Sequence, residues 1–300
     1  MKNKAYLYLF SATCIWGLQP IMMKILLQEY TTITVVFIRC MLMIMCYFSL
    51  MYFSKKKIIL PTKKQLFVLI VMGFCCIPLN NIAQFEGLRY TTAIHCALLG
   101  ATVPTMTAIF AYFILREKLN GIQWIGIFIS FLGVLLMLTR GNIDIITKNN
   151  FNIGDILIII SEIGWSLYII FGRQIMQELS PLITSAWASL SGTLMLVPYA
   201  LLSKQLSFHI PSIKIILVLI FVVVFSGVLA TIIWNMGVNK VGASKSSIFS
   251  NVTPFTALIF SNLILNEQFY FYDILGMIFV CIGVYVLINL NYEYHFRKKE

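Results

Sequence analysis

Ten long apolar segments follow one another along the chain and are separated by short polar stretches. A helix needs roughly 20 mostly apolar residues to cross the hydrocarbon core of a bilayer, which is about 30 Å thick. The segments are too long, and alternate too little between apolar and polar residues, to be strands of a membrane β-barrel. The pattern therefore predicts an all-α integral membrane protein with ten transmembrane helices, at 6–27, 32–53, 66–86, 91–115, 121–139, 153–175, 181–202, 212–236, 243–265 and 270–290.

The second half of the chain repeats features of the first half at a nearly constant offset. Two pairs align at an offset of 149, namely Trp16 with Trp165 and Lys24 with Arg173. Five further pairs align without a gap at an offset of 150: Gly87 with Gly237, Pro104 with Pro254, Glu117 with Glu267, Gly126 with Gly276, and Gly133 with Gly283. The sequence therefore predicts two repeats, 1–148 and 149–300, the second of which includes a short basic C-terminal tail.

Each predicted repeat contains five helices. Because five is an odd number, the second repeat enters the membrane from the opposite face, and the two repeats are inverted with respect to each other. Inverted repeats that meet near the middle of the membrane are typical of transporters that alternate between two open states. The alternative is that a duplicated helical bundle is simply stable.

Charge and composition agree with residence in a membrane. Apolar residues make up 60% of the chain and charged residues only 11%, whereas soluble domains contain roughly 25% charged residues. The net charge of +11 does not indicate nucleic acid, because the basic residues are divided unequally between the two sides of the membrane. With ten helices both termini lie on one side, and fifteen basic residues lie on that side and six on the other. This asymmetry predicts that both termini are cytoplasmic and that the basic loop at 55–64 contacts anionic membrane lipid.

The cysteine positions give no indication of a metal or another cofactor. All seven cysteines lie inside the apolar segments, where a thiol behaves as a small hydrophobic group, and none has the spacing of metal ligands. We therefore expect neither a metal site nor a cofactor.

Four segments of the chain resemble the EamA-type permeases of the drug/metabolite transporter superfamily. They are Trp16-Gly17 followed by Lys24, LREKLNGIQWIGIFISFLGVLL from Leu115, WSLYIIFGRQ from Trp165, and LNEQFYFYDILGMIFVCIGVYVL from Leu265. The last segment departs from its counterpart around Phe269 to Asp273. The resemblance implies a ten-helix permease with a central cavity, and it favours efflux of a metabolite without specifying which one.

Glu162 is the most informative charged residue within the predicted helices. An ionisable group in the middle of a bilayer costs about 2.5–3.5 kcal/mol on insertion scales, so such groups often serve function. Glu162 could bind the ammonium group of a substrate or exchange a proton, and Trp165 lies on the same helix face. The alternative is a carboxyl group that hydrogen-bonds to a neighbouring helix.

Amide side chains end the third predicted helix. Asn80, Asn81 and Gln84 share one broad helix face, which suits either a polar substrate or hydrogen bonds between helices. The offset of 150 places Thr231 and Trp234 at the corresponding positions of the eighth helix, so Trp234 and Asn235 join the candidates for a cavity wall.

Aromatic and polar residues recur near the middle of the first and sixth helices. Trp16 and Gln19 match Trp165 and Tyr168, and each tryptophan lies about 15 Å from the start of its helix by the helical rise. A tryptophan that anchors a helix would lie at the membrane interface. We therefore expect these four residues to line a cavity.

Two further cavity candidates lie early in the fourth and ninth helices. His95 could titrate near physiological pH, although a lone histidine near a helix end is more often simply hydrogen-bonded. Asn251 belongs to the polar start of the ninth helix, some of whose residues we expect to face the cavity.

Other residues of the repeat are expected to serve helix geometry. Pro104 and Pro254 each remove a backbone hydrogen bond and predict either a hinge or a static kink. Gly126, Gly133, Gly276 and Gly283 recur every seven residues and predict close helix contacts. We expect Glu117 and Glu267, at helix ends, to be structural, either by orienting the following turn or by pairing with a basic group.

Arg39 lies within the second predicted helix, and its position allows three interpretations. It could extend toward the lipid headgroups, pair with a carboxylate such as Glu86, or bind the carboxylate of a substrate. The residues alone do not choose among these, and we group Arg39 with the structural charges.

The function predicted from these observations is the transport of a small metabolite across the bacterial inner membrane. An amino acid or a similar amphipathic compound is the first candidate, because the cavity candidates combine tryptophans, amides and one carboxylate. The alternatives are an exchanger of nucleotide sugars and a membrane enzyme for lipid or isoprenoid substrates, although the chain has no Walker motif, His-Cys cluster or aspartate-rich motif. The oligomeric state stays open between a monomer and a homodimer.

Overall fold

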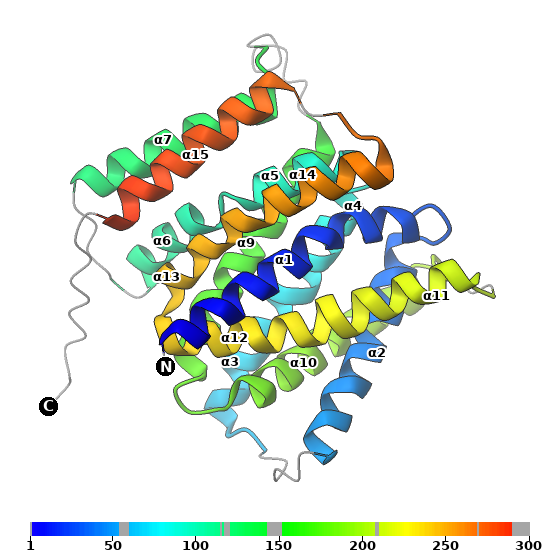
Figure 1. Ribbon diagram of the computed structural model, residues 1–300. Coiled ribbons are helices and arrows are strands. Elements are labelled where there is room, and N and C mark those ends of the chain that lie inside the picture. The colour runs from blue at the N-terminus through cyan, green and yellow to red at the C-terminus, as the bar shows by residue number, and fades with distance from the viewer. Residues whose placement is uncertain are drawn as a thin grey trace, which may run out of the picture.

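A computed structural model describes residues 2–53, 60–114, 116, 121–142, 152–207, 210–268 and 270–289 (Figure 1). The regular structure of these residues is entirely helical. Glu117 lies outside the described residues.

The helices follow the predicted apolar segments. The first half contains α1 (Lys2–Leu26), α2 (Thr32–Phe53), α3 (Lys63–Phe74), η1 (Cys75–Ile82), α4 (Ala83–Gly87), α5 (Ala93–Gly100), α6 (Val103–Ile114) and α7 (Gly121–Thr139). The second half contains α9 (Ile153–Ile175), α10 (Pro181–Leu202), α11 (Ile213–Ile220), η2 (Phe221–Leu229), α12 (Ala230–Val241), α13 (Ala243–Ser247), η3 (Ile248–Asn251), α14 (Val252–Leu265) and α15 (Phe271–Asn289).

Within the described residues, seven continuous helical segments are long and apolar enough to cross a membrane, at 4–26, 32–53, 63–87, 93–114, 153–175, 181–202 and 213–241. Three shorter apolar helices, at 124–139, 249–265 and 271–286, coincide with the fifth, ninth and tenth predicted segments. Large apolar side chains on the outside of the bundle, such as Phe128 and Leu263, are more than half exposed. These features are those of a multi-pass membrane protein.

Side-chain caps define where several helices begin. The hydroxyl of Thr62 accepts a hydrogen bond from the backbone N–H of Gln65, and the Gln65 side chain accepts one from the Thr62 backbone. Thr92 caps α5 in a similar way, because its hydroxyl accepts from the N–H of His95 at 3.0 Å. Such caps satisfy backbone donors that have no partner inside the helix.

Prolines interrupt two helices at corresponding places. The helix at 93–114 breaks between Gly100 and Val103, and Pro104 lies in the first turn of α6. Pro254 lies in the first turn of α14, directly after the 3-10 segment η3. Because proline has no N–H, Pro104 cannot bond to the carbonyl of Gly100, and Pro254 cannot bond to that of Ser250. Each break therefore follows from the missing donor.

Two helices contain wider, π-helical turns that the apolar pattern does not predict. These turns are η1, which contains Pro78, and η2, which contains Gly227. A π-helical turn changes the rotation of the residues that follow it, and such turns frequently occur at functional sites. Asn80 and Asn81 are carried by η1 itself.

Helices from the two halves of the sequence pack against each other at the centre of the molecule. Helix α1 packs against α12 and α14, α9 packs against η1, α4 and α6, and α5 packs against α14. In Figure 1, α7 and α15 lie side by side as a pair at one edge of the bundle. A Cβ atom added to Gly133 would lie 2.5 Å from the backbone oxygen of Gly276, so this contact requires glycine.

Candidate functional site

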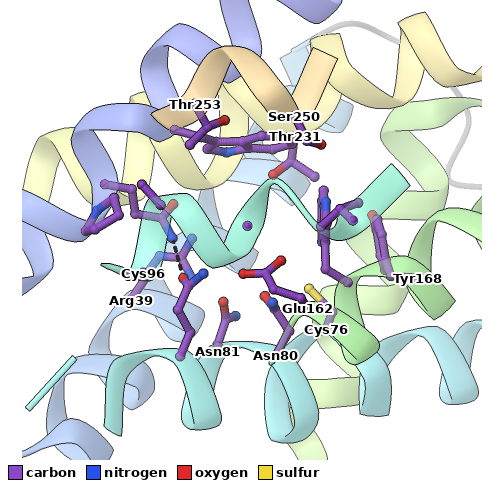
Figure 2. A pocket seen from close by; sticks show the side chains of 18 of the residues that line it. Arg39, Cys76, Asn80, Asn81, Cys96, Glu162, Tyr168, Thr231, Ser250 and Thr253 are labelled. Carbon is purple, nitrogen blue, oxygen red and sulfur yellow. Dashed lines mark hydrogen bonds between the residues drawn. The ribbon is translucent and has the colours of Figure 1, made fainter. Parts of the chain in front are cut away.

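A cavity of about 110 Å³ lies where helices of both halves meet. Side chains of α1, α2, η1, α4, α5, α9, α10 and α12 line it, together with residues at the two interrupted helices (Figure 2). Eight of the predicted cavity residues line this space: Trp16, Gln19, Asn80, Asn81, Gln84, Glu162, Trp165 and Tyr168. Gly100 and Ser250, each four residues before one of the two prolines, also line it.

Glu162 presents a buried carboxylate to the cavity. Its side chain is 5% exposed, and the hydroxyl of Ser161 lies 3.4 Å from its Oε1 atom. Among the described residues it forms no ion pair. Because a buried charge without a partner is costly, Glu162 is available to a cationic group or a proton that enters the cavity.

A chain of polar side chains from both halves of the protein surrounds Glu162. The hydroxyl of Ser226 in η2 donates to Oε1 of Gln19, and Nε2 of Gln19 donates to Oε1 of Gln84 at 3.1 Å. Gln84 also hydrogen-bonds to Glu162. Four elements, η2, α1, α4 and α9, thus share one polar network along the cavity wall.

Aromatic side chains form another part of the wall. The rings of Trp16 and Trp165 meet edge to face with centroids 5.1 Å apart, and Trp165 stacks on Tyr168 at 5.0 Å. Nε1 of Trp16 donates to the backbone oxygen of Ser226 at 3.0 Å, which orients the indole. The cavity therefore combines an apolar aromatic surface with amides and a carboxylate.

Trp234 and Asn235 do not line the cavity, contrary to the prediction. Trp234 is fully buried behind Trp16, with ring centroids 5.1 Å apart. Nδ2 of Asn235 lies 2.9 Å from the hydroxyl oxygens of both Tyr168 and Ser185. Both residues support the aromatic wall from behind, because α12 packs with this face toward α1 and α10.

Two other predicted cavity residues also lie elsewhere. Asn251 does not line the cavity, whereas its neighbours Ser250 and Thr253 do, because the 3-10 turn at η3 rotates the helix at this point. His95 is buried at the end of the bundle where α5 and α9 begin. It faces two carboxylates and not the cavity.

His95 lies between Asp155 of α9 and Asp273 of α15. Its Nδ1 atom is 3.3 Å from both carboxylate oxygens of Asp155, and its Nε2 atom is 3.0 Å from Oδ1 of Asp273. A neutral imidazole has only one N–H donor, so an imidazole with a carboxylate at each nitrogen is best satisfied as a cation. Thr91 donates a further hydrogen bond to Asp155.

Glu267 joins the two halves at the same end of the bundle. Its carboxylate lies 2.9 Å from Nζ of Lys24 and accepts hydrogen bonds from the backbone N–H groups of Ala93 and Ile94. The Ser261 hydroxyl donates to it as well, at 2.6 Å. The pKa of Glu267 lies below its ordinary value, because these hydrogen bonds outweigh the opposing effect of burial. We call the residues Lys24, His95, Asp155, Glu267 and Asp273 the Lys24 cluster.

Arg39 lines the cavity, although we grouped it with the structural charges from the sequence alone. Its side chain is 4% exposed, so it does not extend to the headgroups, and it forms no ion pair with Glu86. Glu86 instead lies 3.8 Å from Nε of Arg89 and accepts a hydrogen bond from Thr32. The close packing of α2 against α10 and η2 turns Arg39 inward.

Several lining residues were not among the predicted ones. They are small, apolar or weakly polar and include Tyr47, Cys76, Cys96, Ser189, Thr231 and Thr253. Of these, Thr231 has a signal in the sequence, because it is the repeat partner of Asn81. Side chains of this kind are common throughout membrane helices, so their type alone does not indicate a cavity.

Comparison with known proteins gives a consistent assignment over the whole chain. The model of the EamA-like transporter family matches twice, at residues 3–139 and 152–289. The curated transporter YyaM of Bacillus subtilis, itself uncharacterized, is 33% identical over 216 residues, which are 72% of this chain and 70% of that protein. The uncharacterized transporter YetK of the same organism is 30% identical over 285 residues, 95% of this chain and 86% of its own length.

A solved crystal structure has the same fold. It superposes with a TM-score of 0.70 and 12% sequence identity, and the match covers 96% of this chain and 97% of that one. At this identity the similarity concerns the fold alone.

Proposed function

Because the chain belongs to the EamA-like transporter family and is a multi-pass membrane transporter and not an enzyme, we propose that it carries a small amphipathic solute, with an amino acid as the first candidate. Transport proceeds across the bacterial inner membrane, and efflux is the favoured direction. The cavity described above is the binding site.

The proposed transport cycle is alternating access between two inverted repeats of five helices each, with both termini in the cytoplasm. The double match to the family model and the aligned pairs from Trp16 and Trp165 to Gly133 and Gly283 support this arrangement. Two similar repeats that can exchange conformations open the cavity first to one side and then to the other. The interrupted helices at Pro104 and Pro254 are the proposed hinges, since breaks in the backbone hydrogen bonding ease bending there.

The observation that carries the proposal is the unpaired carboxylate of Glu162 in a cavity between the halves. Its immediate neighbours are hydroxyl and amide groups, and among the described residues no cation pairs with it. A solute ammonium group or a proton would supply the missing charge. Trp16 and Trp165 would contact the apolar part of the solute.

The size of the cavity supports a small solute. The cavity volume of about 110 Å³ is of the same order as the ~150 Å³ cavity that admits benzene. A nucleotide sugar would require a much larger space than this conformation contains.

Glu162→Gln tests the proposal. We expect it to abolish solute flux into proteoliposomes, because glutamine has nearly the same shape but carries no charge and releases no proton. Glu178→Gln is the matched control, since it makes the same change at an exposed carboxylate that accepts from Gln65, and flux should be retained. Full transport by Glu162→Gln would remove this carboxylate from the mechanism.

A competition screen tests the solute class. Unlabelled amino acids, nucleosides, sugars and nucleotide sugars would be compared as competitors of flux by the purified protein. Competition by nucleotide-linked compounds alone would show that the amino-acid proposal is wrong. Lower cellular accumulation of the competing solute on overexpression would support efflux.

A further inference from the structure

Arg39 is a second buried charge in the cavity, and its guanidinium is only partly satisfied. Nε donates to the backbone oxygen of Val222 at a long 3.4 Å, and Cζ lies 5.4 Å from the centre of the Phe85 ring. Nη1 is buried and has no hydrogen-bond partner among the described residues. A guanidinium has five N–H donors, and the two on Nη1 remain unused.

No acidic side chain in the described structure neutralises Arg39. The elements packed most closely against α2 are α10, η2 and η1, and none of them contains an Asp, Glu, Lys, Arg or His. Glu86, on the neighbouring α4, pairs with Arg89 instead. Because a buried cation without a counter-charge is costly, its retention calls for an anion that comes from outside the protein.

The cavity therefore presents one cation and one anion that do not pair with each other. Arg39 reaches it from α2 and Glu162 from α9, and Figure 2 shows both side chains around the same space together with Asn80 and Asn81. If the cavity served a simple amine, Arg39 would repel it. If it served a simple carboxylate, Glu162 would repel that compound.

We propose that Arg39 binds the carboxylate of the solute while Glu162 binds its ammonium group, so that the protein selects zwitterionic amino acids over the corresponding amines and acids. This inference rests on the proposed function, because it concerns the same cavity. A planar guanidinium suits a carboxylate, since two parallel N–H groups can bond to its two oxygens. The aromatic wall then contacts the side chain of the amino acid.

Three compounds with the same isobutyl group separate the two charges. They are leucine, the amine obtained by removing its carboxyl group (3-methylbutylamine), and the acid obtained by removing its amino group (4-methylpentanoate). Each would be measured as a competitor of solute flux in proteoliposomes that contain the full chain. In the wild type, we expect leucine to compete best.

Arg39→Gln should weaken competition by leucine roughly 10- to 100-fold, which corresponds to the loss of a charged hydrogen bond. Competition by the amine should stay the same or improve, because the repelling cation is gone. Arg39→Lys keeps the charge but not the two parallel N–H donors. Competition by leucine should therefore weaken less in Arg39→Lys than in Arg39→Gln. Equal discrimination among the three compounds by the wild type and Arg39→Gln would overturn the proposal.

A stability measurement distinguishes a folding defect from a loss of solute binding. Arg39→Met removes a buried charge that no carboxylate neutralises, so the purified variant should melt at or above the wild-type temperature without solute. A large drop in melting temperature would show that Arg39 is structural and would also overturn the proposal.

The proposed function and this inference fail in different ways. If leucine does not compete in the wild type but another solute does, the amino-acid assignment is wrong. The same Arg39 variants are then tested against acidic and neutral competitors of that solute. An unchanged preference for acids would remove Arg39 from solute recognition, whereas a lost preference would retain it as the site of an anion.

Discussion

The Lys24 cluster and the cavity both contain buried charges, but they treat them differently. In the cluster, Glu267 lies 2.9 Å from Lys24, and His95 lies within 3.3 Å of Asp155 and Asp273. In the cavity, Arg39 and Glu162 form no ion pair among the described residues. Buried charges that pair are compensated inside the protein, whereas unpaired ones keep their binding capacity for a visiting molecule.

The difference also concerns what each region connects. The cluster links the start of α5 to α9, the end of α14 and the start of α15, so it joins elements that are distant in sequence. The cavity charges each come from within one long helix, α2 or α9. Removing a charge should therefore damage stability in the first region and transport in the second.

The largest expected effect on stability is that of Asp155→Ala. It removes a carboxylate next to His95 and leaves the imidazolium and the Thr91 hydroxyl without that partner. Breaking a buried pair in this way costs about 3–5 kcal/mol. Denaturation of the purified protein in detergent measures the loss.

Asp155→Asn is the control for this change, because it preserves the shape and an acceptor for Thr91 but not the charge. Its free energy of unfolding should lie between those of Asp155→Ala and the wild type. If Asp155→Ala were as stable as the wild type, the cluster would not be the structural counterpart of the cavity.

A smaller loss is expected for Glu267→Gln. The variant keeps one acceptor but loses the charge that faces Lys24 and the first N–H groups of α5. Hydrogen bonds to charged groups contribute roughly 1.5–3 kcal/mol each, and the partial exposure of Lys24 reduces this figure. Glu178→Gln, at an exposed carboxylate, should have almost no effect.

The pH dependence of stability provides an independent test of Glu267. Because its pKa is lowered in the folded protein, its contribution is fully present above the ordinary carboxyl pKa of 4.5 and is lost as the pH falls through the lowered pKa. As the pH falls below 5, the stability of Glu267→Gln should therefore decline less than that of the wild type. Melting curves at several pH values measure this difference. Parallel curves for the two proteins would contradict a compensated charge at this position.

Among the buried charges, the smallest stability effect is expected for Glu162→Gln. Replacing a buried, unpaired carboxylate with a neutral amide of the same shape removes a desolvation cost and leaves the hydrogen bonds from Ser161 and Gln84 possible. The change in unfolding free energy should be below about 1 kcal/mol, although transport is lost. Strong destabilisation by this variant would remove the distinction between the two regions.

Much of the cavity could be predicted because its residues carry chemistry that is unusual in a membrane. Glu162 is conspicuous inside an apolar helix, and the amides from Asn80 to Gln84 lie within about one and a half helical turns. Trp16 and Trp165 occupy repeat-related positions near the middle of their helices. These signals depend only on residue type and spacing, which are present in one sequence.

The errors arose where the rotation of a helix about its own axis was decisive. Trp234 and Asn235 were assigned to the cavity but do not line it, and the three interpretations of Arg39 left open that it lines the cavity, as it does. The offset of 150 relates α4 to α12, yet the π-helical turns at η1 and η2 change the rotation of both helices. The position of His95 depended on Asp155 and Asp273, which are 60 and 178 residues away in the sequence.

The sequence by itself determined that the chain is helical, resides in a membrane and contains two related halves. Those properties follow from the length of apolar segments and from residues that recur at a constant offset, and both are local or periodic. Only the tertiary structure decided which buried charges meet a partner. That outcome depends on how α2, α5, α9, α14 and α15 are rotated and packed, and packing pairs Asp155, Asp273 and Glu267 while it leaves Arg39 and Glu162 facing a shared cavity.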